Sequence, residues 1–246
     1  MSTSSAQSRA KRIGMLTPSS NTVLEPLTAA MLQDVPDVSA HFGRFRVLKI
    51  ALDADALDQF TSAPMLDAAS MLADAKMHTI CWNGTSSGWL GFDADDQLCE
   101  EIEERTGISA CTSVLALNEI LQLTNAKRIA FVTPYLDEIQ SAIVKNYESN
   151  GFSVVAEEHL QDAGNYSFSE YTEEQITDMC RKVARDKPQA ICVFCTNFRG
   201  AAVAPIIEKE TGIPVYDTVS TALWKSLQMC EIKPSVIKGW GSIFEV

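Results

Sequence analysis

The sequence predicts an α/β protein with two pseudo-symmetric lobes, each a parallel sheet flanked by helices, and a functional site in the cleft between them. Short apolar runs alternate with longer amphipathic ones, as in parallel sheets covered by helices. Three segments also occur twice, in the same order and at similar spacing. Arg12-Ile13 followed by Thr17-Pro18 is repeated as Arg128-Ile129 followed by Thr133-Pro134. The polar turn at 84–88 has a counterpart at 195–200, and Thr106-Gly107-Ile108 is repeated as Thr211-Gly212-Ile213.

The apolar runs predict the strands, and the amphipathic runs between them predict the helices. In chain order, we place strands at Ile13–Leu16, Ala40–Arg46, Thr79–Trp82, Arg128–Val132, Ser153–Ala156, Ala190–Phe194 and Val215–Tyr216. Helices are expected near Leu24–Leu32, Ala54–Asp74, Asp93–Glu104, Val114–Leu123, Asp137–Ser149, Glu173–Arg185, Ala204–Glu210 and Thr221–Met229. The alanine, leucine and methionine stripe of Ala54–Asp74 is typical of a packing surface. Gly107 and Gly212 suit the left-handed backbone that ends a helix.

The boundary between the lobes is expected near residue 112. We assign residues 13–112, with a C-terminal return at about 217–246, to the first lobe and residues 113–216 to the second. Residues 1–12 are small and polar and lack the apolar stretch of a signal peptide, so we expect a disordered tail and a cytoplasmic protein. No apolar run approaches the length of a membrane span, so no membrane partner is expected.

Charge and composition narrow the choice of ligand. The chain has 246 residues and a net charge of -12, which disfavours nucleic acid because phosphates need a basic surface. A small carboxylate remains a suitable substrate, since backbone dipoles bind anions inside acidic proteins. The three histidines are scattered and the common phosphate, dinucleotide and zinc motifs are missing, so we expect no cofactor and no metal. A homo-oligomer is compatible with the sequence but not required by it.

Polar turns follow several of the predicted strands, where parallel sheets bind their ligands. They include Thr17-Pro18-Ser19-Ser20-Asn21, Asn83-Gly84-Thr85-Ser86, Thr133-Pro134-Tyr135 and Cys195-Thr196-Asn197. Hydroxyls, amides and free N–H groups at helix N-termini suit an anion. Each turn alone is also explained by helix capping, but together they predict a cleft that binds a carboxylate.

Cys195 is the candidate reactive side chain. The seven cysteines are odd in number and irregularly spaced, which argues against a disulfide framework. Cys195 follows an apolar strand at the mouth of a predicted helix, where the helix dipole is expected to lower the thiol pKa and make it a nucleophile or proton donor. The alternative is a buried core residue. Cys192 lies inside the apolar run, and we interpret it as core.

Five segments in order resemble one enzyme superfamily. They are Pro18-Ser19-Ser20-Asn21-Thr22, Asn83-Gly84-Thr85-Ser86, Thr133-Pro134-Tyr135 with Asp137, Phe194-Cys195, and Gly239-Trp240-Gly241-Ser242-Ile243-Phe244. From Arg12 to Val246 the chain resembles the aspartate/glutamate racemase superfamily, in the branch of maleate isomerases and arylmalonate decarboxylases. The resemblance implies an enzyme that needs no cofactor.

Gly84 stands where the isomerases and racemases of that superfamily carry a first-lobe cysteine. Cys81 lies earlier in the strand, on the opposite face if the strand stays extended, so we do not expect it to substitute. The resemblance therefore implies a decarboxylase of a small malonate-like diacid, with Cys195 protonating an enediolate. Thr85, Ser86, Tyr135 and the amide of Thr196 would form the dioxyanion hole, with Ser19, Asn21 and Gly84 also at the substrate.

Two other functions stay open. One is a cis–trans isomerase or racemase that acts on a maleate-like or amino-acid-derived carboxylate with one cysteine. The other is a non-catalytic carboxylate-binding protein. Ser19-Ser20-Asn21 predicts a more polar first-lobe pocket than that of the decarboxylases, and Arg199 either lies at the surface or pairs with a second substrate carboxylate.

Overall fold

The computed structural model describes residues 10–52 and 61–246. Residues 1–9 of the predicted tail and the first part of the predicted helix Ala54–Asp74 lie outside this range. The first strand begins at Lys11 rather than at Ile13, because the N–H groups of Lys11 and Arg12 are already bound, to the carbonyl of Asp37 and to Nδ1 of His78. Within the described ranges, no helix is both long and apolar enough to cross a bilayer.

Two four-stranded parallel sheets form the lobes and share one strand order. The first sheet, ordered β2-β1-β3-β4, contains β1 (Lys11–Pro18), β2 (Val38–Phe45), β3 (Thr79–Trp82) and β4 (Ala110–Thr112). The second, ordered β6-β5-β7-β8, contains β5 (Arg128–Thr133), β6 (Ser153–His159), β7 (Ala190–Val193) and β8 (Val215–Asp217). Each strand has a counterpart in the other lobe, which confirms the predicted two-lobed fold.

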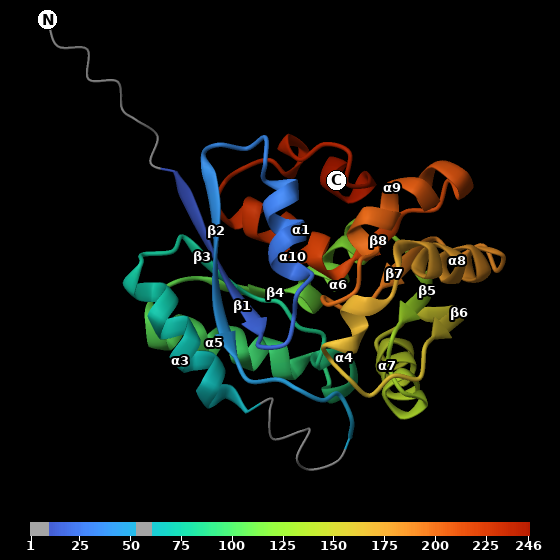
Figure 1. Cartoon of the computed structure of the whole chain (residues 1–246), viewed down its shortest axis with the longest axis horizontal. Coiled ribbons are helices and arrows are strands. Elements are labelled where there is room, and N and C mark those ends of the chain that lie inside the picture. Colours follow the sequence, from blue (N-terminus) through green and yellow to red (C-terminus); the bar gives the residue numbers. More distant parts are fainter. Residues whose placement is uncertain (1–9, 53–60) are drawn as a thin grey trace, which may run out of the picture.

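The helices pack against these sheets (Figure 1). They are α1 (Leu24–Met31), α3 (Ser62–Asp74), α4 (Ser87–Leu90), α5 (Asp93–Thr106), α6 (Ser113–Leu123), α7 (Asp137–Ser149), α8 (Glu173–Ala184), α9 (Gly200–Thr211) and α10 (Thr218–Met229). Short 3₁₀ helices are η1 (Ser167–Glu170), η2 (Pro234–Val236) and η3 (Ser242–Glu245). As predicted, α5 and α9 end at glycines with left-handed backbone, Gly107 and Gly212, each with φ of 70°.

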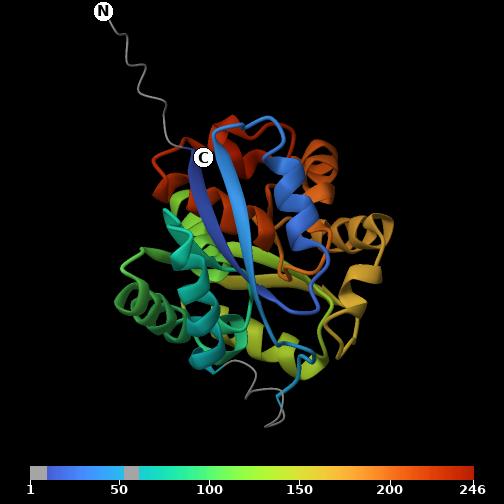
Figure 2. The same ribbon diagram turned by 60° about the vertical axis from the view of Figure 1, so that its left-hand side comes forward.

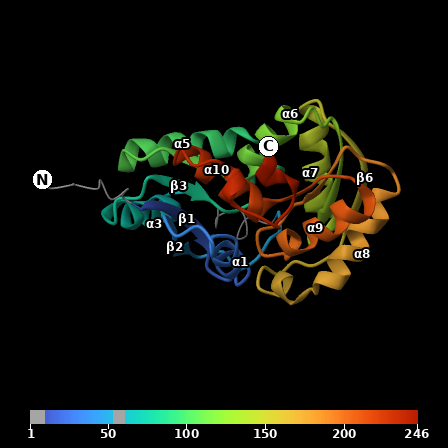
Figure 3. The ribbon, with the colours of Figure 1, turned by 90° about the horizontal axis from the view of Figure 1, so that it is seen from above.

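The long strands β1 and β2 of the first lobe are paired and run side by side in Figure 2. Figure 3 shows the first-lobe strands on the left, β6, α8 and α9 on the right, and α10 between them. Helix α10 packs against α6 and also contacts β3 and β4. At this junction the Thr221 hydroxyl donates to the carbonyl of Ser113 at 2.8 Å. The C-terminal segment therefore ties the two lobes together.

Helix α4, which the sequence analysis did not predict, docks the first lobe onto the second. Asn146 of α7 donates its side-chain N–H groups to the carbonyls of Ser87 and Gly88, each at 3.2 Å. A Cβ on Gly88 would lie 2.5 Å from Cε1 of Phe194, so only glycine permits this approach. The contact brings the turn that precedes α4 to the carboxyl end of β7.

Candidate active site between the two lobes

A small cavity lies where the turns of the two lobes meet. Its walls are formed by Pro18, Val47, Ile50, Trp82, Gly84, Thr85, Trp89, Tyr135, Asn165, Cys195 and Thr196. It is tight, with a free volume of about 20 Å³, about enough for one water molecule. None of these lining residues carries a charged side chain. The lining residues can therefore hold a polar group by hydrogen bonds but not by ion pairs.

The Cys195 thiol belongs to a chain of polar groups that crosses the cleft. The hydroxyls of Thr85, from the first lobe, and Tyr135, from the second, lie 2.6 Å apart. The Tyr135 hydroxyl also hydrogen bonds with the Cys195 thiol, which in addition accepts the backbone N–H of Asn197. A ligand carboxylate in the cavity would thus meet several hydrogen-bond donors next to one thiol.

Burial keeps the Cys195 thiol protonated. The residue is 3% exposed, and burial raises its pKa to about 12, partly offset by the hydrogen bonds from Tyr135 and from the Asn197 N–H. The prediction of a lowered thiol pKa is therefore wrong. Helix α9 begins only at Gly200, so its dipole lies too far along the chain to outweigh the loss of solvent, because the effect fades within one turn. Such a thiol is suited to donating a proton.

Gly84 faces an indole ring in the cavity wall. A Cβ on Gly84 would lie 2.0 Å from Cζ2 of Trp82, so the ring fills the space into which a cysteine at this position would project. Cys81 does not replace that thiol. It is fully buried in β3 beside Cys111 of β4, and burial raises its pKa well above the ordinary value. Among the lining residues, Cys195 is the one thiol.

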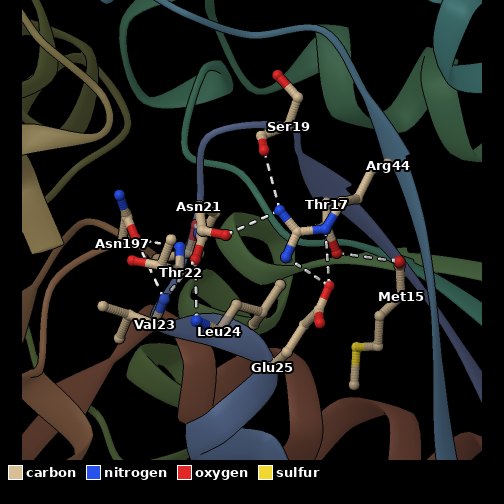
Figure 4. Close-up of polar contacts among 11 residues, drawn as sticks. Met15, Thr17, Ser19, Asn21, Thr22, Val23, Leu24, Glu25, Arg44 and Asn197 are labelled. Carbon is tan, nitrogen blue, oxygen red and sulfur yellow. Dashed lines mark hydrogen bonds and ion pairs between the residues drawn. The ribbon is translucent and has the colours of Figure 1, made fainter.

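Ser19 and Asn21 do not line the cavity. Oδ1 of Asn21 accepts the N–H groups of Val23 and Leu24, each at 2.9 Å, so it caps α1 (Figure 4). The hydroxyl of Ser19 accepts the N–H of Val47 at 3.2 Å.

The guanidinium of Arg44 fixes the same loop from its outer side (Figure 4). It donates to the carbonyls of Ser19 and Asn21 and pairs with Glu25 at 2.7 Å. The predicted polar pocket in the first lobe is therefore absent from these walls, because the polar side chains are used within the loop. Pro18, Val47 and Ile50 form an apolar wall there instead.

The other predicted residues divide between the cavity and its surroundings. The hydroxyl of Thr196 donates to the carbonyl of Asn83 at 3.0 Å and accepts from Nδ2 of Asn21 at 3.2 Å, so it joins the lobes. Ser86 precedes α4 and lines a separate cavity in the first lobe. Arg199 donates to the carbonyl of Ser169 at 3.2 Å and is not a lining residue. Cys192 is fully buried in β7, as predicted.

Several lining residues were not identified from the sequence. Trp82 and Trp89 flank the Gly84-Thr85-Ser86 turn. A large aromatic side chain on each side of a polar turn is the feature of the sequence that could have identified them as lining residues. Val47, Ile50 and Asn165 come from irregular segments, where no periodicity shows which side chains face inward. Asn165 is held by a bond from its Nδ2 to the carbonyl of Val47 at 3.3 Å.

Asn197 connects the lobes beneath the cavity, and its loss should destabilise the protein. Its Oδ1 accepts the N–H groups of Thr22 at 2.9 Å and Val23 at 3.3 Å, and its Nδ2 donates to the carbonyl of Asn165. Asn197→Ala should lower the free energy of unfolding by about 1–3 kcal/mol, because buried groups lose their partners. Urea denaturation measures the change. The exposed Asn150→Ala serves as control, and equal effects of the two substitutions would contradict this role.

Comparisons with known proteins agree with this architecture. Residues 13–244 match the model of the arylmalonate decarboxylase family. The maleate isomerase of Nocardia farcinica is 25% identical over 240 residues, which cover 95% of each chain. The maleate isomerase of Pseudomonas putida is 23% identical, over 94% of this chain and 96% of its own.

Solved structures show the same fold. A mutant of the Nocardia farcinica maleate cis–trans isomerase with a covalently bound succinylcysteine intermediate matches with a TM-score of 0.86 and 24% identity, over 95% of this chain and 98% of that one. Arylmalonate decarboxylase matches with a TM-score of 0.77 and 20% identity, over 95% and 99%. Since the family model spans both lobes and the cavity between them, the chain belongs to the arylmalonate decarboxylase family of cofactor-independent enzymes.

Proposed function

We propose that this protein is a cofactor-independent decarboxylase of a small malonate-like dicarboxylate. The observation that carries the proposal is a single protonated thiol in a cavity with uncharged walls. A solved mutant of arylmalonate decarboxylase carries a cysteine in place of a glycine and a serine in place of a cysteine, so the unmutated enzyme has a glycine and a cysteine at these two positions. The pair Gly84 and Cys195 matches that combination.

The two sides of the cavity support different parts of the reaction. One substrate carboxylate would accept hydrogen bonds from Thr85 and Tyr135. The other would lie against Val47 and Ile50, and none of the described lining residues supplies a cation to balance its charge. A carboxylate in such surroundings is destabilised relative to neutral CO₂, which favours breaking its bond to the α-carbon.

The Cys195 thiol completes the reaction by protonating one face of the α-carbon. When CO₂ leaves, the electron pair of the broken C–C bond stays on the α-carbon and spreads into the remaining carboxylate as an enediolate. The same hydrogen bonds then stabilise the growing negative charge. Cys195 transfers its proton to the α-carbon, which gives the monocarboxylate product, and the thiolate regains a proton from water. Its high pKa ensures that the proton is present when each cycle begins.

Isomerisation of a maleate-like compound is the second candidate, because the relatives at 25% and 23% identity are maleate isomerases. One solved maleate isomerase holds a succinylcysteine, in which a cysteine sulfur is bonded to the substrate carbon. By this route, a Cys195 thiolate would add to the double bond, the new single bond would rotate, and elimination would release the trans diacid. This route requires a deprotonated thiol.

Product analysis distinguishes the two candidates. The purified protein is incubated with methylmalonate, with phenylmalonate and with maleate, each in D₂O. We expect CO₂ from a malonate, one deuterium on the α-carbon of the product, and no fumarate. Fumarate formed from maleate without CO₂ from any malonate would overturn the proposal in favour of isomerisation.

The pH dependence of kcat gives an independent check. Because the raised pKa keeps Cys195 protonated, kcat for decarboxylation should stay nearly constant between about pH 6 and 9. A thiolate nucleophile would behave differently, since below its pKa the reactive fraction rises about tenfold with each pH unit. A rate that climbs in this way would contradict the role of Cys195 as proton donor.

A further inference from the structure

Trp82 lies between the cavity at the lobe junction and a second cavity at the surface of the first lobe. The second cavity has a free volume of about 200 Å³, is open to solvent, and is lined by Ser62, Met65, Trp82, Ser86, Leu90, Ala94, Asp95, Gln97, Leu98 and Glu101. Trp82 is the residue that the two linings share. The indole is therefore a partition between a smaller chamber, which holds the thiol, and a larger one.

The position of the indole is fixed by its neighbours. Trp82 is the last residue of β3 and is fully buried. Its ring lies 5.1 Å from that of Phe45, centroid to centroid, at an interplanar angle of 45°. The missing side chain at Gly84 provides the space that the ring occupies, since any Cβ there would overlap it. Trp82 and Gly84 thus form a matched pair, and the ring cannot retreat without repacking the strand end.

We propose that Trp82 is a specificity-determining residue that limits the size of the substituent on the substrate α-carbon. The inference rests on the proposed function, because it takes the thiol cavity as the substrate site. With the ring in place, the free volume beside the thiol is about 20 Å³, so a substituent as small as a methyl group is favoured over a larger one. Without it, a larger group would reach the side chains of Met65, Leu90 and Leu98 on the far side. These three side chains are apolar and would contact an aryl or branched alkyl group. Asp95 and Glu101 belong to the same lining and disfavour a negatively charged substituent there.

Binding of simple monocarboxylates tests this role without requiring turnover. Calorimetry measures the Kd of propionate and phenylacetate for the wild type, Trp82→Ala, Trp82→Leu and Trp82→Phe. The wild type should bind propionate more tightly than phenylacetate. In the Ala and Leu variants the Kd of phenylacetate divided by that of propionate should fall by about tenfold or more. This is the effect expected when a pocket gains room for a larger group. Trp82→Phe should shift this ratio least.

Circular dichroism and thermal melting establish which variants fold, and Trp82→Leu replaces Trp82→Ala if the latter does not. The matched control is Trp240→Ala, a half-buried tryptophan outside both linings, which should leave the ratio unchanged. An unchanged ratio in a folded Trp82 variant would overturn the proposal. So would a wild type that binds neither acid. If the ratio shifts but no malonate is decarboxylated, the size limit stands and the proposed reaction fails.

Discussion

Replacing Cys195 by alanine should lower kcat for decarboxylation by about 10³-fold, because the general acid that protonates the intermediate is lost. The thiol sits in the cleft between Tyr135 and the N–H of Asn197, and among the lining residues no second thiol can take its place. Initial rates of CO₂ release measure the effect. The fold should remain intact, since alanine removes only one sulfur atom.

Cys192→Ala is the matched control. Cys192 lies in β7, fully buried and outside the cavity lining, so its replacement should change stability and leave kcat nearly unchanged. Cys195→Ser should remain strongly impaired, because an alcohol is a much weaker acid than a thiol. If Cys195→Ala kept more than about a tenth of the wild-type rate, Cys195 would not be the general acid.

Tyr135→Phe should lower kcat by about 10²-fold, the usual loss for one donor to a developing oxyanion. The hydroxyl lies 2.6 Å from that of Thr85 and also bonds to the Cys195 thiol. Its removal therefore weakens the binding of the enediolate and the orientation of the acid together. The effect should appear more in kcat than in KM, because the negative charge on the bound carboxylate oxygens increases as the enediolate forms.

Tyr147→Phe separates this effect from simple packing. Tyr147 is also a fully buried tyrosine, and within the described part of the chain its hydroxyl has no hydrogen-bond partner. Its replacement should leave kcat unchanged and stability equal or slightly higher, because an unpaired buried hydroxyl is lost. Equal losses of kcat in the two variants would refute the assigned role of Tyr135.

The duplicated sequence predicted the arrangement of the sheets, because each lobe repeats the same strand and helix pattern. Strand β4 was missed, although it follows Thr106-Gly107-Ile108 as β8 follows Thr211-Gly212-Ile213. Its residues, Ala110-Cys111-Thr112, include no valine, isoleucine or aromatic residue, whereas β8 begins with Val215-Tyr216. Helix α4 was missed because it is one turn long and contains Gly88, whose role depends on a contact with the other lobe.

Within the site, sequence reasoning found the residues that lie directly after strands. Gly84, Thr85, Tyr135, Cys195 and Thr196 all line the cavity. It did not show how the polar side chains of the first turn are used, because capping and ligand binding draw on the same residue types. Nor could it give the ionisation state of the thiol, which depends on burial by residues distant in the sequence.

The inaccessible sulfur of Cys195 also determines how the protein responds to thiol reagents. Alkylating agents and peroxides attack the thiolate, and they do so fastest at exposed sites. A protonated thiol in a residue that is only 3% exposed will react slowly with both. Activity should therefore persist in air without added reductant, and survival after treatment with iodoacetamide would not argue against catalysis by cysteine.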